Sequence, residues 1–214
     1  EFRKSSKLSI KDIGALKEEV RDTVSRYLEL ENYLDISSSF QNPIAEINIQ
    51  TDEDVEKAVN QLLSDWQVGI NALPNVIDLL EDKEIKVVEI DAPEGFDGFS
   101  GWANTNIPLI VISKNYSVER KRFTSLHELG HLLLNFHPKL SHKDIEKFCH
   151  RFAGAMLIPE RTFYREFGKN RNIISINELI AVKETYGVSI QAIMARAKAL
   201  GVINEATYKS FCIK

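Results

Sequence analysis

The sequence of 214 residues has little cysteine and no long hydrophobic run. Its two cysteines, Cys149 and Cys212, are too few for a framework of disulfides, so the composition indicates a reducing cytoplasm. No apolar run approaches the roughly 18–20 residues of a membrane span and no signal-peptide pattern opens the chain, so we expect no membrane association. The net charge of −4 argues against a broad nucleic-acid footprint, and we expect no strong direct nucleic-acid binding.

Internal repeats, low-complexity tracts and a phosphate-binding loop are also missing from the sequence. Gly95, Gly98 and Gly101 have the wrong spacing for a phosphate loop, and they alternate with aromatic residues as in hairpin strands. Hydrophobic residues make up 43% of the chain, which is enough for the core of one large domain or two small ones.

Hydrophobic periodicity predicts an α+β fold, with a small mixed or antiparallel sheet between helical segments at both ends. We expect an N-terminal helical segment and linker over 1–43, a core over 44–160 and a helical extension over 161–214. Residues 1–9 show no pattern, and a chain that starts with Glu1 suggests a fragment or a processed protein. The expected helices are 11–34, 51–66, 74–81, 117–135, 141–157, 160–167, 175–186, 189–200 and 204–211, and the expected strands are 44–49, 85–90, the hairpin near 95–102, and 108–113.

The five histidines all fall within 24 residues, which scattered surface histidines would not do. His127 and His131 flank Glu128 in the pattern H-E-x-x-H, and residues four apart share one face of a helix. Both imidazoles can therefore bind one metal ion, and Glu128 can hold and deprotonate a water molecule beside it. The cluster comprises His127, His131, His137, His142 and His150.

A catalytic zinc ion needs a third protein ligand, for which the sequence offers two candidates. His137 has the spacing of the metzincin class, but that class needs a glycine where this chain has Leu134. Glu146 lies on the next predicted helix, as in the gluzincin arrangement, and we take it as the ligand. His150 lies one turn later, and we expect it to hydrogen-bond the outer atom of a metal ligand rather than the metal itself. We expect His142 to be a solvent-exposed residue without a role.

Two longer stretches surround these residues: 122–134 reads RFTSLHELGHLLL, and 146–159 reads EKFCHRFAGAMLIP. Both resemble the ImmA/IrrE family of zinc metallo-endopeptidases. The resemblance implies a zincin-like minimal metalloprotease core, one Zn²⁺ per chain, and Glu146 as third ligand. The family's usual asparagine is replaced by His150, which leaves a fourth metal ligand open. Longer members carry a helix-turn-helix ahead of the segment that begins here near Ser5.

The function we expect is that of a zinc-dependent endopeptidase in which a metal-activated water attacks the peptide bond and Glu128 acts as general base. The family resemblance implies a helix-turn-helix transcriptional repressor as the protein substrate, in a stress or mobile-element response. The substrate would pair with an edge strand, which we place in the region from Gly98–Trp102 to Ile112. Candidates for an oxyanion donor are Tyr116, Tyr164 and Tyr186.

Two other functional classes stay open at this point. One is a non-catalytic zinc-binding module that regulates an attached DNA-binding domain. The other is an interaction protein whose histidines are structural. Substrate identity, cleavage site, activating signal and oligomeric state do not follow from the sequence.

Overall fold

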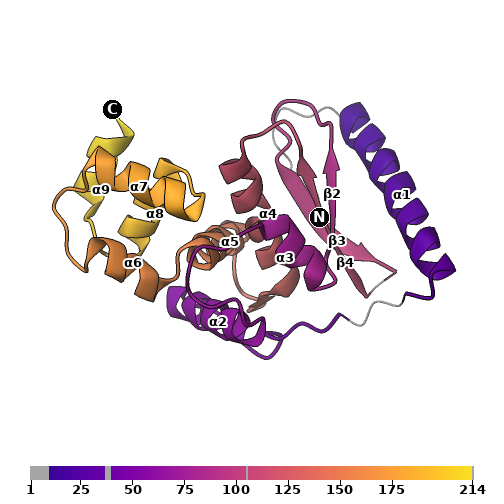
Figure 1. Cartoon of the computed structure of the whole chain (residues 1–214), viewed down its shortest axis with the longest axis horizontal. Helices are drawn as coiled ribbons and strands as arrows, with labels where there is room; N and C mark the ends of the chain where they lie inside the picture. The colour runs from indigo at the N-terminus through magenta and orange to yellow at the C-terminus, as the bar shows by residue number, and fades with distance from the viewer. Residues whose placement is uncertain (1–9, 37–39, 105, 214) are drawn as a thin grey trace.

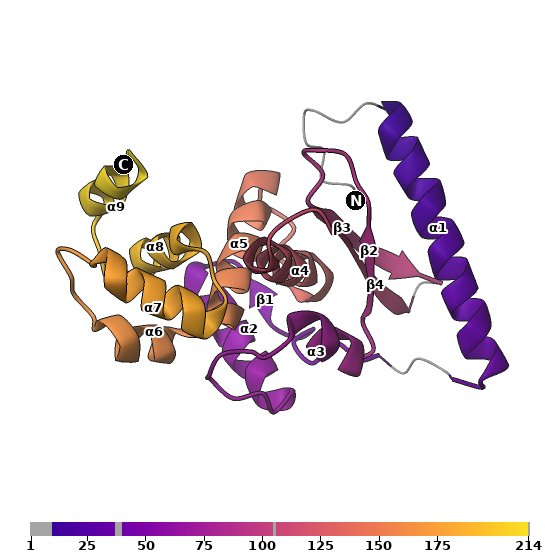
Figure 2. The same ribbon diagram turned by 45° about the horizontal axis from the view of Figure 1, so that its top comes forward.

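The computed structural model of the protein describes residues 10–36, 40–104 and 106–213. Residues 1–9, for which the sequence predicts no regular element, lie outside the described residues. The fold is α+β as predicted, with a central sheet covered on one face by α1 (Ile10–Tyr33) and on the other by α4 (Val118–Leu133) (Figure 1). The turned view shows the C-terminal helices at the end of the molecule remote from α1 (Figure 2).

The main sheet has three strands in the order β2-β4-β3, and its mixed pairing agrees with the prediction. The central strand β4 (Ile107–Ser113) pairs parallel with β2 (Lys86–Ile90) and antiparallel with β3 (Gly98–Ala103). Because β4 is buried on both faces, its sequence is a continuous apolar run rather than an alternating one. Leu109 and Val111 pack in one cluster with residues of α1, whereas Ile110 and Ile112 belong to the main core.

A second, two-stranded sheet was not predicted. β1 (Asn48–Ile49) pairs parallel with β5 (Asn135–Phe136), so the expected helix over 117–135 ends two residues early. Leu134 caps α4 with an extended backbone, and the chain then crosses to donate a hydrogen bond from His137 N to Ile49 O. This long-range pairing outweighs the local helical pattern, which is why periodicity alone missed it.

The remaining helices follow the predicted order. One start is wrong: the helix expected at residue 74 begins at Val76, because the Asn75 side chain accepts from the backbone of Ile77 and caps it, with Pro74 outside. None of the helices in the described ranges is long and apolar enough to cross a membrane. The helices besides α1 and α4 are α2 (Asp52–Asp65), α3 (Val76–Asp82), α5 (His142–Leu157), α6 (Glu160–Phe167), α7 (Ile176–Tyr186), α8 (Ile190–Ala199) and α9 (Glu205–Cys212).

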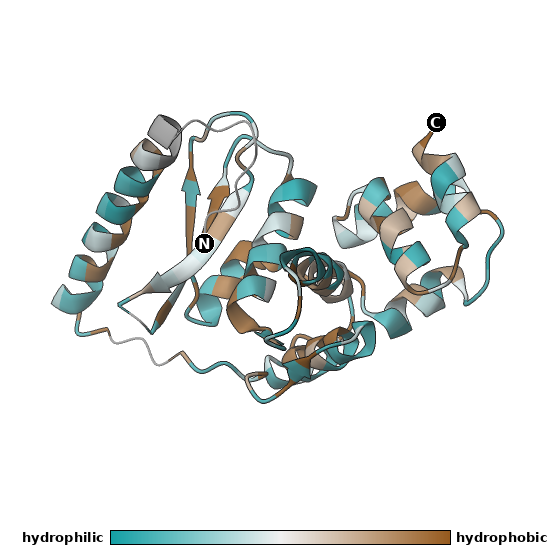
Figure 3. Cartoon of the chain, turned by 180° about the vertical axis from the view of Figure 1, so that it is seen from behind, coloured by the Kyte–Doolittle hydropathy of each residue, from teal (hydrophilic) through white to brown (hydrophobic). Residues whose placement is uncertain are grey.

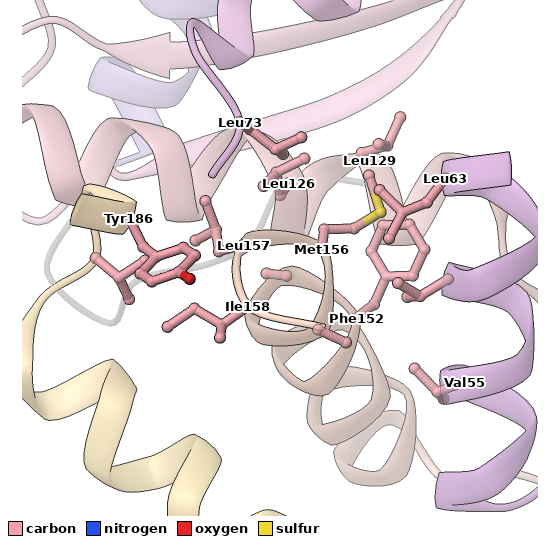
Figure 4. Close-up of a cluster of buried hydrophobic side chains, with 14 of the residues drawn as sticks. Val55, Leu63, Leu73, Leu126, Leu129, Phe152, Met156, Leu157, Ile158 and Tyr186 are labelled. Carbon is pink, nitrogen blue, oxygen red and sulfur yellow. The ribbon is translucent and has the colours of Figure 1, made fainter. Parts of the chain in front are cut away.

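The main core lies where α2, α4 and α5 meet, as the close-up of its side chains shows (Figure 4). Leu126 and Leu129 of α4 pack there with Phe152 and Met156 of α5, and all four are fully buried. Hydrophobic residues also concentrate on the strands and central helices in the hydropathy view, whereas α1 is largely hydrophilic (Figure 3). The two helices that carry the candidate metal ligands are therefore fixed by the best-packed part of the molecule.

A buried network of ion pairs joins the C-terminal helices to this core. Arg196 of α8 donates from Nη2 to Glu56 Oε2 at 2.8 Å and from Nε to the carbonyl of Ile158 at 3.2 Å. Arg151 of α5 donates to Glu56 Oε1 at 2.9 Å and to Asp52 Oδ2 at 3.1 Å. Only 3% of the Arg196 side chain is exposed, so its guanidinium is shielded from water, and its contacts tie α8 to α2 and α5.

The start of α7 is expected to be sensitive to acid. The Ser175 backbone N–H, and next the Arg171 guanidinium, lower the pKa of Glu178 from 4.5 to about 2. Because the folded-state pKa is depressed, the stabilisation is present above the unfolded pKa of 4.5 and is lost as the pH falls through about 2.

Urea unfolding should show a smaller loss of stability below about pH 5 in Glu178→Gln than in the parent chain. Glu184→Gln, an exposed change on the same helix, is the control; an equal loss in all three proteins would contradict this role.

Candidate metal centre

Helix α4 presents His127, Glu128 and His131 to one side of the core. Its N-terminus is fixed by Ser117, whose side chain accepts from Arg120 N. His127 and Glu128 are buried, whereas 25% of the His131 side chain is exposed. The two histidines lie one turn apart, as the H-E-x-x-H pattern predicts, and their Nε2 atoms are 3.2 Å from each other.

Glu146 reaches the two histidines because α4 and α5 pack closely at Gly130. A Cβ there would lie 3.3 Å from Cys149 Cα and from Phe152 Cδ1, so a larger residue would force α5 to shift by a few tenths of an ångström. Helix α5 itself begins with a capping box in which Ser141 and Asp144 exchange hydrogen bonds. The resulting register places Glu146 Oε1 at 3.2 Å from His131 Nε2.

The three donor groups have the spacing that zinc requires. Glu146 Oε2 lies 3.6 Å from His127 Nε2, so the carboxylate approaches each histidine with a different oxygen, and the three group-to-group separations fall between 3.2 and 3.6 Å. Ligands at about 2.0–2.2 Å from zinc in tetrahedral geometry lie roughly 3.3–3.6 Å apart. The residues therefore fit a zinc ion.

His150 belongs to the same cluster. Its ring lies 4.4 Å from the ring of His127 and 5.9 Å from that of Phe123, nearly parallel to the latter. Ligand atoms of His127, Glu146 and His150 lie within 4.8 Å of one another, which makes this second set a geometrically possible metal site as well. His150 is exposed, so it forms the solvent-facing wall of the cluster.

Glu128 has a contact that the sequence analysis missed. Ser100 of β3 donates a hydrogen bond from Oγ to Glu128 Oε2 at 2.9 Å, and both residues are buried. The sequence feature that could have indicated this contact is Gly98, which lies two residues before Ser100 on the same face of β3. A Cβ there would lie 2.7 Å from Val111 O of β4 and 3.0 Å from Thr124 Cγ2 of α4, so a larger residue would move β3 away from both the neighbouring strand and the helix that carries Glu128.

Within the described part of the chain, β3 is an edge strand of the main sheet, and its outer edge runs past this site. The bond from Ser113 N to Asp97 O sets the alternation, so Gly98, Ser100 and Trp102 direct their backbone N–H and C=O groups away from β4. Pro108, which has no N–H, accordingly pairs with Trp102. The expected substrate strand extended to Ile112, but β4 is paired on both sides, which leaves β3 as the edge beside Glu128.

Two further histidines of the cluster and one tyrosine predicted as an oxyanion donor have contacts of their own. His137 lies between β5 and α5, and its Nδ1 accepts from Lys139 N at 3.3 Å, while His142 is exposed in the first turn of α5. The choice of Glu146 as third ligand stays a prediction, supported by its distances of 3.2 and 3.6 Å to the two imidazoles. Tyr116 stacks under the Arg120 guanidinium at 3.7 Å.

Two tyrosines proposed as oxyanion donors lie in the C-terminal helical segment. Tyr164 donates to Leu200 O at 3.3 Å, and Tyr186 donates to Glu166 Oε1 at 2.7 Å. Burial is the main reason that the pKa of each is raised, so both hydroxyls stay protonated at neutral pH. The oxyanion role of these two and of Tyr116 stays a prediction.

Comparison with known families bears directly on this site. Residues 80–198 match the family model described as the IrrE N-terminal-like domain, peptidase M78. The match covers more than half of the chain. The chain belongs to this family. The IrrE-like region includes α4 and α5 with all the candidate metal ligands, so the resemblance seen in the sequence is confirmed.

Similarity to whole proteins is weaker than similarity to the family model. No curated protein matches the chain. A transcriptional regulator from Mycobacterium tuberculosis is similar in structure, with a TM-score of 0.47 and 16% identity over 67% of this chain and 46% of that one. The IrrE-like chain thus spans less than half of that regulator.

Proposed function

We propose that this IrrE-like chain is a zinc-dependent endopeptidase. His127, His131 and Glu146 would hold one zinc ion, and Glu128 would act as general base. The observation that carries the proposal is that two imidazole Nε2 atoms and the Glu146 carboxylate, separated by 3.2–3.6 Å, lie beside the buried carboxylate of Glu128. A zinc ion bound there supplies a Lewis acid that polarises the scissile carbonyl and makes a water molecule more acidic.

The chain's own residues supply the rest of the chemistry. Glu128 accepts the proton of the attacking water and then delivers it to the leaving amine. Ser100 holds one carboxylate oxygen of Glu128 by its hydrogen bond, which fixes the orientation of the base. The backbone groups of Gly98, Ser100 and Trp102 that face away from β4 would pair with an extended substrate, so that the peptide bond lies next to Glu128.

The substrate class we propose is a helix-turn-helix transcriptional repressor, removed in a stress or mobile-element response. This part of the proposal is supported by the chain's membership of the IrrE-like family. An extended, flexible segment of such a protein is the form that β3 can accept, because strand addition requires an unpaired backbone.

The direct test is proteolysis of a library of proteome-derived peptides by the full chain. The protein is stripped with a chelator, reloaded with zinc, and the products are identified by mass spectrometry. We expect new peptide ends only with the zinc-loaded protein. Products that are absent in both samples, or equally abundant in both, would contradict the proposal.

Ser100 gives a finer prediction. Ser100→Ala should lower kcat by about 10- to 100-fold with little change in KM, because a hydrogen bond to a charged group contributes about 1.5–3 kcal/mol. Ser100→Thr retains the hydroxyl and should recover most of the activity. Zinc content should equal that of the parent chain in both variants; loss of zinc from Ser100→Ala, or no loss of kcat, would refute the positioning role.

The position of His150 favours a second candidate, a non-catalytic zinc-binding module of a transcriptional regulator. The family's asparagine is a histidine here, and this imidazole belongs to the same cluster as His127 and Glu146. A fourth protein ligand would close the position that catalysis needs. Full zinc occupancy without any peptide cleavage, followed by a gain of cleavage in His150→Asn, would select this alternative.

A further inference from the structure

A cavity of about 490 Å³ adjoins the candidate metal centre on the side of the C-terminal helices. Phe123 and His150 form part of its wall, and the His150 ring also lies 4.4 Å from the His127 ring, so the cavity and the metal cluster share one side chain. The volume falls within the range of roughly 300–1,000 Å³ that is typical of ligand pockets. It lies between α5 and α8, with Tyr208 of α9 at one side.

The cavity exists because the two helices face each other with small residues. Gly154 of α5 lies opposite Ala192, Ala195 and Ala199, which follow the i, i+3, i+7 spacing of one helix face. A Cβ at Gly154 would meet only Arg196 Cδ, at an ordinary 3.7 Å. Ala195 and Ala199 are exposed, so the cavity is open to solvent and larger side chains there would fill it without disturbing the core.

Cations line both the interior and the mouth of this cavity, and they differ in how far they are exposed to water. The buried guanidinium of Arg196 is held by two hydrogen bonds to Glu56. Lys147 and Lys198 are 60% and 40% exposed, and they pair with Asp52 and Glu205 at 2.9 and 2.6 Å. These two ammonium groups keep part of their hydration and can exchange their partners for a carboxylate of a bound molecule.

We propose that this cavity is the substrate subsite that determines specificity. It receives a large apolar side chain from a residue next to the scissile bond, and Lys147 and Lys198 favour an acidic residue beside it. The inference rests on the proposed peptidase function. His150 lines the cavity and contacts His127, which places the cavity beside the metal ligands. The substrate is thus an extended segment with an apolar anchor and a neighbouring carboxylate.

The test separates binding from cleavage by using zinc-loaded Glu128→Gln, which is expected to bind peptides without cutting them. Peptides retained from the library should be enriched in leucine, methionine or phenylalanine next to aspartate or glutamate. Ala195→Phe in the same background should weaken their binding by about 10- to 100-fold, the usual effect of changes in an apolar pocket. Ala181→Phe, on the exposed surface of α7, is the matched control and should bind as the parent does.

The outcomes distinguish this inference from the proposed function. Unchanged binding and unchanged residue preference in Ala195→Phe, with zinc content intact, would overturn the subsite. Loss of the acidic preference in Lys147→Gln/Lys198→Gln would support its charged mouth, and retention of that preference would refute it. If the enriched peptides bind in the predicted manner but the parent chain cleaves none of them, the subsite stands and the peptidase proposal fails.

Discussion

Glu128→Gln is expected to lower kcat/KM for peptide cleavage by about 10²- to 10⁴-fold while the chain retains its zinc. Glutamine has nearly the same shape as glutamate and its amide oxygen can still accept from Ser100, so the fold and the metal ligands should be undisturbed. It cannot take up a proton at neutral pH, however, and the attacking water then lacks its base. The measurement is steady-state cleavage of a library-derived peptide together with metal analysis.

The matched control for this variant is Glu53→Gln, an exposed change of the same kind on α2. It should cleave peptides at the parent rate. Parent-like turnover in Glu128→Gln would refute the role of Glu128 as base, and loss of zinc would show that this carboxylate belongs to the metal site instead.

Arg196→Ala is expected to lower the free energy of unfolding by about 3–5 kcal/mol. The substitution removes two hydrogen bonds from Glu56 and leaves its buried carboxylate with Arg151 alone. It also removes the donor to Ile158 O at the end of α5. Urea unfolding of the full chain measures the loss, and Arg161→Ala, an exposed change on α6, should cost little.

A second variant separates the cost of an unpaired charge from lost packing. In Glu56→Leu/Arg196→Met both charges are replaced by apolar side chains of similar size, so no buried carboxylate is left without its main partner. We expect this double variant to be more stable than Arg196→Ala. If the double variant is the less stable of the two, the ion pair itself, rather than the penalty of breaking it, stabilises the junction.

Much of the fold follows from local sequence signals. Regular apolar spacing located the helices to within a few residues, and in the structure Ser141 and Ser175 cap two of them. The pairing of β1 with β5 did not follow, because two-residue strands have no periodicity and their partners are far apart in sequence. The role of Asn75 as a cap was missed since Pro74 beside it is an equally common helix-start signal.

In the candidate site, too, local patterns were predictable from the sequence and contacts between distant elements were not. H-E-x-x-H is a local pattern on one helix, so it predicted the adjacency of His127 and His131 directly. The approach of Glu146 depends on how α4 packs against α5, and Gly130, inside the motif, is the residue that permits it. The contact of Ser100 with Glu128 and the cavity beside His150 require three-dimensional packing of elements that no spacing rule connects.

The most direct test of the account is the zinc affinity of the full chain, measured by competition with a chromophoric chelator. We predict one zinc ion per chain and an affinity that falls by more than about 100-fold in Glu146→Ala, because loss of a ligand should exceed the roughly 10- to 100-fold effect of an outer contact. His150→Asn should retain the ion with less than about a tenfold change. Parent-like affinity in Glu146→Ala, or an equal loss in His150→Asn, would contradict the ligand set of His127, His131 and Glu146.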